Sequence, residues 1–144
     1  MGINIKQNSD GSMGLEGAAT GGQGEFIPVT LSYVAASTAT AIIFTASRAY
    51  AVQSILGRSN VAGTGGACTI SLYSVPSGTA VASGTLLHTG SFNVVGTANT
   101  NQTLTLSATA AALTIPAGNS IGYVITGTPT SAVGVISIGL TPAN

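Results

Sequence analysis

From Ile27 onward, apolar and polar residues alternate along the chain, and this period of two constrains the fold more than any other feature. The alternation is plain in "IPVTLSYV" (27–34), and it recurs at 50–56, 68–73, 103–107, 121–125 and 136–140. Successive side chains of a β-strand point to opposite faces, so alternation rich in β-branched residues predicts half-buried strands. At 50–56 we expect Tyr50, Val52 and Leu56 to share one face.

Turn sequences rich in Gly, Pro and Asn separate the expected strands, at 62–67, 75–80, 96–101, 115–120 and 126–131. About eight to ten short strands at this spacing are typical of an all-β fold, an antiparallel β-sandwich. The Pro-Ala-Gly-Asn corner at 116–119, which leads into an alternating strand, favours a jelly-roll-like form. We assign "SATAAAL" (107–113) to strand and loop and not to a helical turn, because Thr flanks the alanines and Pro116 follows closely.

Residues 1–26 differ in composition from the rest of the chain. They hold seven glycines and four of the six charged residues, and only "INIK" (3–6) looks like a strand. Gly-rich polar segments lose too much conformational entropy to fold by themselves. We therefore expect an extended N-terminal arm over 1–26, ordered by packing against another surface, and a β-sandwich domain over 27–144. A frayed terminus is the alternative for the arm.

Charge is nearly absent from the expected sandwich. Charged residues make up 4% of the chain, against about 25% in an average protein. Arg58 is the last of them, so residues 59–144 contain no Asp, Glu, Lys or Arg. A net charge near zero argues against nucleic acid as a partner, because phosphate contacts need Lys or Arg. It also predicts weak repulsion between copies, and hence ready association.

Membrane insertion and export are not indicated by the sequence. No apolar run approaches the roughly 20 residues that a spanning helix needs, and "MGINIKQNSDGS" lacks the apolar core of a secretory signal. We expect no membrane partner and synthesis in a reducing compartment.

The residues that catalysis requires are not grouped in the sequence. The three carboxylates, Asp10, Glu16 and Glu25, all precede the expected sandwich, whereas acid–base catalysis needs paired titratable groups in one pocket. One His and one Cys cannot supply the four ligands of a structural zinc site. We therefore expect no enzyme, no metal and no cofactor. We place His88 near a strand end, at the surface or in an interface, and Cys68 in the core because it is in phase with its apolar neighbours.

Aromatic side chains give only a weak indication of carbohydrate binding. A sugar site on a sandwich usually has an aromatic platform, and this chain has no Trp. The alternation places Tyr33 and Tyr123 in the core. Tyr50 and Tyr73 remain as candidates for exposed rings.

Three stretches give the chain a resemblance that covers nearly its whole length. "INIKQNSDGSMGLEG" (3–17), "SGTLLHTGSFNVVGTANTNQTLTLSATAAAL" (83–113) and "GTPTSAVGVISIGLTPAN" (127–144) resemble small decoration, or cement, proteins of tailed bacteriophages. The resemblance lies in turn and strand sequences and includes no catalytic motif. It implies a jelly-roll-like sandwich that forms homodimers or homotrimers, lies on the outer surface of the capsid and bridges major capsid proteins. Such a protein is made in the host cytoplasm and becomes part of the virion.

The arm supplies most of the candidate contacts with the capsid or with other subunits. A strand such as Ile3–Lys6 could add to the edge of a partner's sheet through main-chain hydrogen bonds. The candidate residues of the arm are Ile3, Ile5, Lys6, Met13, Leu15 and Glu16. Arg48 and Arg58 flank an expected strand, either as solvated strand ends or as salt-bridge partners of another molecule. Because charges are so few, we favour the second interpretation and add both arginines to the candidate contacts.

Two alternatives remain open at this point. The first is a head-fibre or receptor-binding module, which would be present in few copies per particle. The second is a carbohydrate-binding sandwich of non-viral origin, which would bind glycan as an isolated domain.

Overall fold

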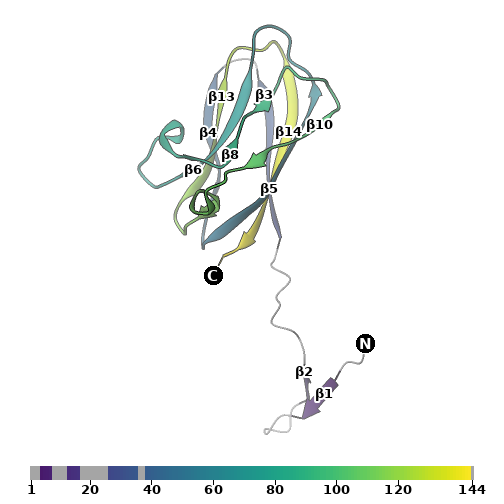
Figure 1. The fold of residues 1–144 in the computed structure, drawn as a ribbon, viewed down its shortest axis with the longest axis vertical. Coiled ribbons are helices and arrows are strands. Elements are labelled where there is room, and N and C mark those ends of the chain that lie inside the picture. Colours follow the sequence, from purple (N-terminus) through teal and green to yellow (C-terminus); the bar gives the residue numbers. More distant parts are fainter. Residues whose placement is uncertain (1–3, 8–12, 17–25, 36–37, 144) are drawn as a thin grey trace.

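The computed structural model describes residues 4–7, 13–16, 26–35 and 38–143, and over these residues the protein is all-β and antiparallel (Figure 1). The fourteen strands of this part of the chain are β1 (Asn4–Gln7), β2 (Met13–Glu16), β3 (Ile27–Ala35), β4 (Ala39–Thr45), β5 (Tyr50–Val61), β6 (Thr69–Val75), β7 (Thr85–Leu86), β8 (His88–Thr89), β9 (Phe92–Asn93), β10 (Asn101–Thr103), β11 (Thr105–Leu106), β12 (Thr114–Ile115), β13 (Ser120–Thr126) and β14 (Ala132–Pro142). Two short 3₁₀ helices, η1 (Val81–Ser83) and η2 (Ala110–Leu113), interrupt them.

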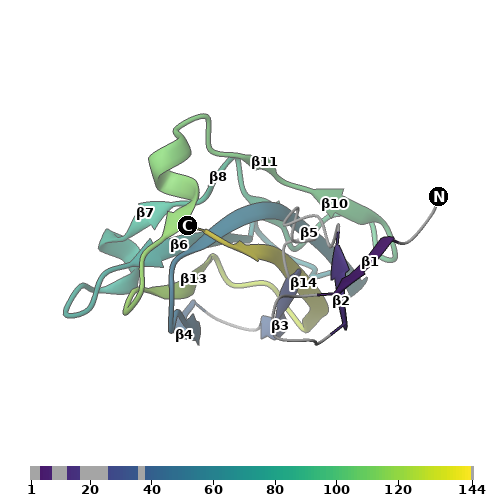
Figure 2. The same cartoon turned by 90° about the horizontal axis from the view of Figure 1, so that it is seen from below.

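Two five-stranded sheets form the two layers of the sandwich (Figure 2). The first has the order β10-β5-β14-β3, with β12 also paired to β5. The second has the order β4-β13-β6-β7, with β9 also paired to β6. The chain crosses between the layers from β3 to β4, back from β4 to β5 and again from β5 to β6. Later crossings follow from β9 to β10, from β12 to β13 and from β13 to β14. Two further two-stranded ladders are β8-β11 and β1-β2.

The core lies between the two sheets and confirms most of the predicted alternation. Each sheet contributes its inward residues to one apolar cluster. Its fully buried members include Ile55, Ile136, Ile138 and Leu140 from the first sheet and Ile70, Leu72 and Ile121 from the second. Burying one such side chain stabilises the fold by about 1.5–3 kcal/mol. The predicted alternation in the β3, β6 and β14 segments therefore identifies the inward face correctly.

The predicted alternation at 50–56 is wrong in its second half, because β5 contains a β-bulge. The register of β5 with β14 shifts by one residue, pairing Val52 with Leu140 but Ser54 with Gly139. The extra residue, Gln53, reverses the alternation, as a bulge does. Beyond it Ile55 is fully buried, whereas Leu56 faces outward with 43% of its surface exposed.

Two local predictions also need correction. In "SATAAAL", Ala110–Leu113 forms the η2 turn and not a strand, since the alanines follow their helical preference for one turn before β12 begins. In the arm, the predicted strand "INIK" overlaps β1 at 4–6, but β1 pairs with a second strand, β2, that the sequence did not suggest. The rest of the predicted arm lies largely outside the described residues.

Candidate interaction surface

The outward side of the β10-β5-β14-β3 sheet is a broad exposed surface, which we call the open face. Its residues alternate with the core residues of the same strands, and the strand register sorts them into three rows. These rows are Val34–Val133–Val61, then Ser32–Val135–Arg58–Asn101, then Thr30–Ser137–Leu56–Thr103. Arg58 is the one charged residue among these positions.

The first row is a stripe of three exposed valines on neighbouring strands. Val133 of β14 pairs with Val34 of β3 on one side and with Val61 of β5 on the other. Their side chains are exposed by 73% at Val34, 50% at Val61 and 36% at Val133. Apolar side chains that are adjacent and exposed in this way mark a surface suited to a partner.

Next to the valine stripe lies a shallow depression centred on Arg58. It has a volume of about 230 Å³ and is lined by Leu56, Gly57, Arg58, Asn101, Val135 and Ser137. The Nη2 of Arg58 donates a hydrogen bond of 3.1 Å to Oδ1 of Asn99. Asn99 is held by its own backbone N–H, which donates to the Ser59 carbonyl at 2.7 Å. The guanidinium is thus partly positioned, and within the described residues Asn99 is the side chain that it bonds.

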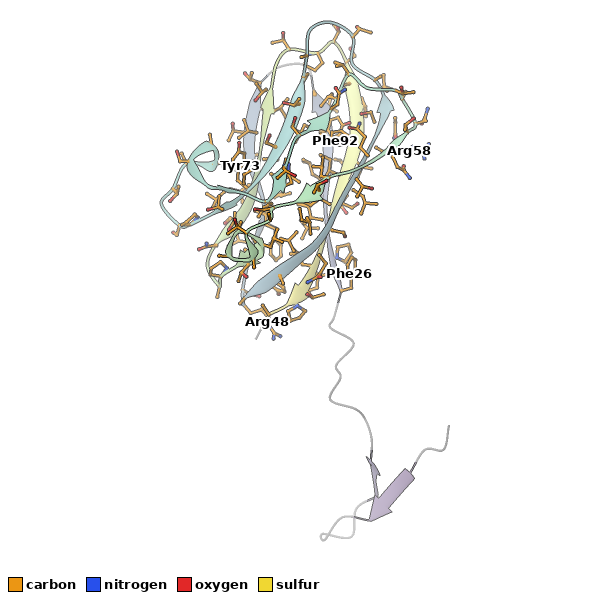
Figure 3. The ribbon with its side chains drawn as sticks, in the orientation of Figure 1. Phe26, Arg48, Arg58, Tyr73 and Phe92 are labelled. Carbon is orange, nitrogen blue, oxygen red and sulfur yellow. The ribbon has the colours of Figure 1, made fainter. Side chains whose placement is uncertain are left out.

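Phe26 lies at the other end of the open face, next to the start of β3 (Figure 3). Its ring covers Gly139 so closely that a Cβ added there would overlap Phe26 Cζ. The ring is still 58% exposed. An apolar ring therefore extends the open face along β14, away from the valine stripe.

The outward side of the β4-β13-β6-β7 sheet is covered in part by its own connection, although Ile42 and Leu86 stay exposed. The η1 segment between β6 and β7 packs against β4, β6 and β13. The contact is close at Gly122 of β13, where an added Cβ would lie 2.7 Å from Val81 Cγ1 and 3.1 Å from Ile42 Cδ1. The two sheets therefore differ in how far the chain itself covers them.

The candidate contact residues fall in separate parts of the molecule. Ile3 lies outside the described residues. Ile5 and Lys6 lie in β1, and Met13, Leu15 and Glu16 lie in β2. The prediction that both arginines flank a strand is wrong for Arg58, which lies inside β5 because that strand continues to Val61. Arg48 is exposed in the β4–β5 connection, far from Arg58 (Figure 3).

The register of the β1–β2 hairpin puts its three apolar residues at positions of one face, together with Gln7. Ile5 pairs with Leu15 and Gln7 with Met13, whereas Asn4 pairs with Glu16 and Lys6 with Gly14. Cross-strand partners share a face, so the apolar residues of the hairpin fall at positions on one face. A two-stranded hairpin alone is marginally stable in water. This register therefore suits a hairpin that packs against another surface.

The prediction that His88 lies at the surface is wrong. Its ring is 1% exposed, and Nε2 accepts a hydrogen bond of 3.0 Å from the backbone N–H of Leu72. Nδ1 lies near the backbone of Thr89 and Gly90 but forms no well-aligned hydrogen bond within the described residues. Burial lowers the pKa of His88, and the neighbouring backbone groups oppose this in part. The ring is a neutral structural acceptor, held inside by the β8–β11 ladder.

The tyrosine predictions are partly correct. Tyr33 is buried as expected, and its Oη lies 2.7 Å from Ser59 Oγ in a hydrogen bond. Burial raises the pKa of Tyr33, and the bond to Ser59 opposes that rise. Tyr50 is buried and packs edge-on against Phe44, so it is no surface ring. Tyr73 and Tyr123 are half-buried.

The prediction for Cys68 is confirmed. The side chain is fully buried in the core cluster. Burial also raises the pKa of the Cys68 thiol, which disfavours the reactive thiolate.

The sequence did not reveal the open face itself. The valine stripe depends on which residues of three distant segments become neighbours, and no local pattern encodes that. Within the described ranges, no group of three or more His, Cys, Asp or Glu residues is placed to hold a metal ion. The same ranges contain no helix long and apolar enough to span a membrane. Comparisons of the chain with protein-family models, with curated proteins and with solved structures found no match.

Proposed function

We propose that this protein is a structural virion component that decorates the outer surface of a bacteriophage capsid and stabilises the head by bridging major capsid proteins. The sequence resemblance at 3–17, 83–113 and 127–144 supports this proposal, and so does the antiparallel sandwich. We further propose that the sandwich is jelly-roll-like and that the protein acts as a homodimer or homotrimer. It needs no cofactor and catalyses no reaction.

The observation that carries the proposal is the open face. A sheet surface with exposed valines, hydroxyls, one amide and a single arginine suits burial against protein better than long-term exposure to water. The scarcity of charge elsewhere on the sandwich points the same way, because copies repel one another little. Many identical copies on a lattice attach firmly even if each contact is weak.

The test is a titration of the purified protein onto heads that lack it, followed by a count of bound copies per particle. We expect saturation at hundreds of copies and a higher temperature of head disruption. Saturation at a handful of copies would instead indicate a head-fibre or receptor-binding role. Failure to bind heads, together with saturable binding to a glycan array, would replace the proposal with a carbohydrate-binding module.

A matched pair of variants connects this test to the open face. Val34→Lys adds a charge to the valine stripe, and Thr40→Lys adds the same charge to an exposed position of β4 in the other sheet. If the open face is buried in the decorated head, Val34→Lys lowers the number of bound copies and Thr40→Lys does not. Equal binding by both variants would remove the open face from the attachment.

A further inference from the structure

The two sides of the sandwich end in edge strands of different length. On one side the edges are β3 of the first sheet, with nine residues, and β4 of the second sheet, with seven. Figure 2 shows these two strands at the same side of the layers. On the other side the edges are strands of two or three residues, namely β10 and β12 beside β5, and β7 and β9 beside β6. A long edge strand presents a row of main-chain N–H and C=O groups with which another chain can pair.

The β3–β4 side has few of the features that protect an edge strand from such pairing. Residues 26–47 contain no Asp, Glu, Lys or Arg, whereas charge is a common protection. β4 has a β-bulge, since its register with β13 shifts between Ile42 and Phe44. β3 keeps one register with β14 over its whole length and carries one proline, Pro28, near its start. Within the described residues β14 is the strand that pairs with β3, so β3 is the better template for an added strand.

Pro28 also indicates which main-chain groups of β3 face the outer edge. A proline has no N–H, and an edge strand tolerates it where that position faces away from the neighbouring strand. The direction of the main-chain groups repeats at every second residue of a strand. We therefore expect Thr30, Ser32 and Val34 to turn their N–H and C=O groups to the outer edge, at the spacing that an added strand needs. Their side chains are exposed on the open face.

We propose that two copies of this protein pair through β3 about a two-fold axis perpendicular to the sheet, so that their β10-β5-β14-β3 sheets become one. The axis lies beside Ser32, which faces its own counterpart, and Thr30 faces Val34 of the second copy on either side. Each of these three pairs exchanges two main-chain hydrogen bonds, about six in all. The pairing itself does not depend on the capsid.

The register centred on Ser32 fits the sequence of β3 better than its neighbours do. It places the buried residues of the strand opposite one another, for example Leu31 opposite Tyr33. A shift by one residue would set buried residues against exposed ones. A shift by two residues toward the start of the strand would bring Pro28 into the ladder, where its missing N–H loses a hydrogen bond. The opposite shift would shorten the ladder.

Charge and area favour a second copy as the partner of this edge. Because residues 26–47 carry no charge, the same edge of two copies can meet without repulsion. β4 packs against β3 on the same side, so a second copy would contact both layers (Figure 2). β3 is about 30 Å long, and two packed layers with their outer side chains are roughly 20 Å deep, so each copy would bury about 600 Å². The total of about 1,200 Å² lies at the lower end of specific protein interfaces.

The two-fold axis determines how the dimer presents its open faces. Rotation about an axis perpendicular to a sheet does not exchange the two faces of that sheet. Both open faces therefore lie on the same side of the joined sheet. This consequence rests on the proposed function: if the open face attaches to the capsid, each dimer attaches at two places at once, which strengthens weak contacts.

Charges placed at the centre of the contact test the pairing. Sedimentation velocity is measured on the full chain, without heads, for the wild type, for S32K and S32E, and for the controls T103K and T103E. Ser32 and Thr103 are both exposed on the open face, at opposite edges of one sheet. We expect the wild type and both Thr103 variants to be dimers, and S32K and S32E each to weaken dimerisation about tenfold, since like charges then lie opposite each other. An equimolar mixture of S32K and S32E is expected to regain the dimer.

Amide hydrogen exchange separates edge pairing from other forms of association. The amides of Thr30 and Val34 are expected to exchange about tenfold more slowly, or slower still, in the wild type than in S32K, because they are bonded only in the dimer. The amides of Leu31 and Tyr33 are expected to exchange slowly in both, because they face β14. Circular dichroism checks that each variant keeps the fold, since Ser32 and Thr103 are outside the core.

The proposal is overturned if the wild type is a monomer or a trimer, or if the Ser32 and Thr103 variants behave alike. It is also overturned if the mixture regains nothing, or if Thr30 and Val34 exchange equally fast in the wild type and in S32K. A monomeric wild type that binds heads would overturn the dimer and leave the proposed function standing. A dimer that pairs through β3 but binds no heads would do the reverse.

Discussion

The two outward faces of this sandwich are built from similar strands, but the chain covers them to different extents. On the β4-β13-β6-β7 sheet, the η1 connection packs on β4, β6 and β13 and places Val81 over Gly122. On the β10-β5-β14-β3 sheet, Val34, Val61 and Leu56 remain largely exposed. The connection covers only part of the first face, where Ile42 is still 46% exposed, whereas the valine stripe of the second face is exposed on three neighbouring strands.

Two glycines that face outward, one in each sheet, show this difference. Gly122 lies beneath Val81 and Ile42, and Gly139 lies beneath Phe26. Val81 belongs to a turn that packs on three strands, whereas the Phe26 ring is 58% exposed. One cover is a connection between two strands, and the other is a single, largely exposed side chain.

The largest effect is expected from placing a methyl group under the covered face. We expect Gly122→Ala to lower the free energy of unfolding by about 1–3 kcal/mol, because the Cβ meets the Ala41 carbonyl at 3.0 Å as well as Val81. Gly139→Ala is the matched variant on the open face. There the Phe26 ring and the Ser54 hydroxyl can turn aside, and the loss is expected to stay below about 0.5 kcal/mol.

Urea unfolding of both variants measures this difference. Equal losses would show that Phe26 is held as firmly as η1, and the distinction between a covered and an open face would then be lost at this end of the molecule.

Sequence patterns predicted most of the inward residues of the two sheets, but they did not predict which outward residues would form an exposed apolar surface. Alternation identified Ile136, Ile138 and Leu140 as inward residues because strand geometry alone decides that. The outward position of Leu56 was not predicted, because the bulge at Gln53 depends on how β5 pairs with β14.

The burial of His88 and the position of the valine stripe were not predicted, because both depend on residues that are distant in the sequence. The burial of His88 depends on β11 and Leu72, which lie 16 or more residues away in sequence. The stripe depends on the register of three strands. Composition leads us to expect ready association of a chain with 4% charged residues, and this stays a prediction. Composition could not indicate which of the two outward faces would be more exposed.

A second, smaller effect on the stability of the sandwich is expected from a fall in pH. Residues 27–144 contain no Asp or Glu, so His88 is their only side chain that titrates between pH 5 and pH 8. Burial lowers the pKa of His88 in the folded state, so below about pH 6.5 the unfolded chain binds more protons than the folded one. Stability is therefore fully present above that pH and decreases as the pH falls.

The expected slope is at most about 1.4 kcal/mol per pH unit, which is the value for one proton. Thermal or urea unfolding between pH 5 and pH 8 measures it. His88→Gln, which keeps an acceptor for the Leu72 N–H, is expected to lose about 1 kcal/mol at pH 8 and to show an almost flat profile. A profile in His88→Gln as steep as in the wild type would assign the acid response to the arm.

The smallest effect on stability is expected on the valine stripe. Val34 is 73% exposed, so Val34→Thr removes little buried apolar surface, and the β-branched shape suits the strand equally well. We expect the free energy of unfolding to change by less than about 0.5 kcal/mol. Attachment to heads should weaken in the same variant, because the hydroxyl would be desolvated where the open face is buried. Unfolding and head binding of the same variant therefore separate the two roles of a strand residue. A loss of stability above about 1 kcal/mol would show that the stripe already supports the isolated fold, and unchanged head binding would show that the attachment surface lies elsewhere.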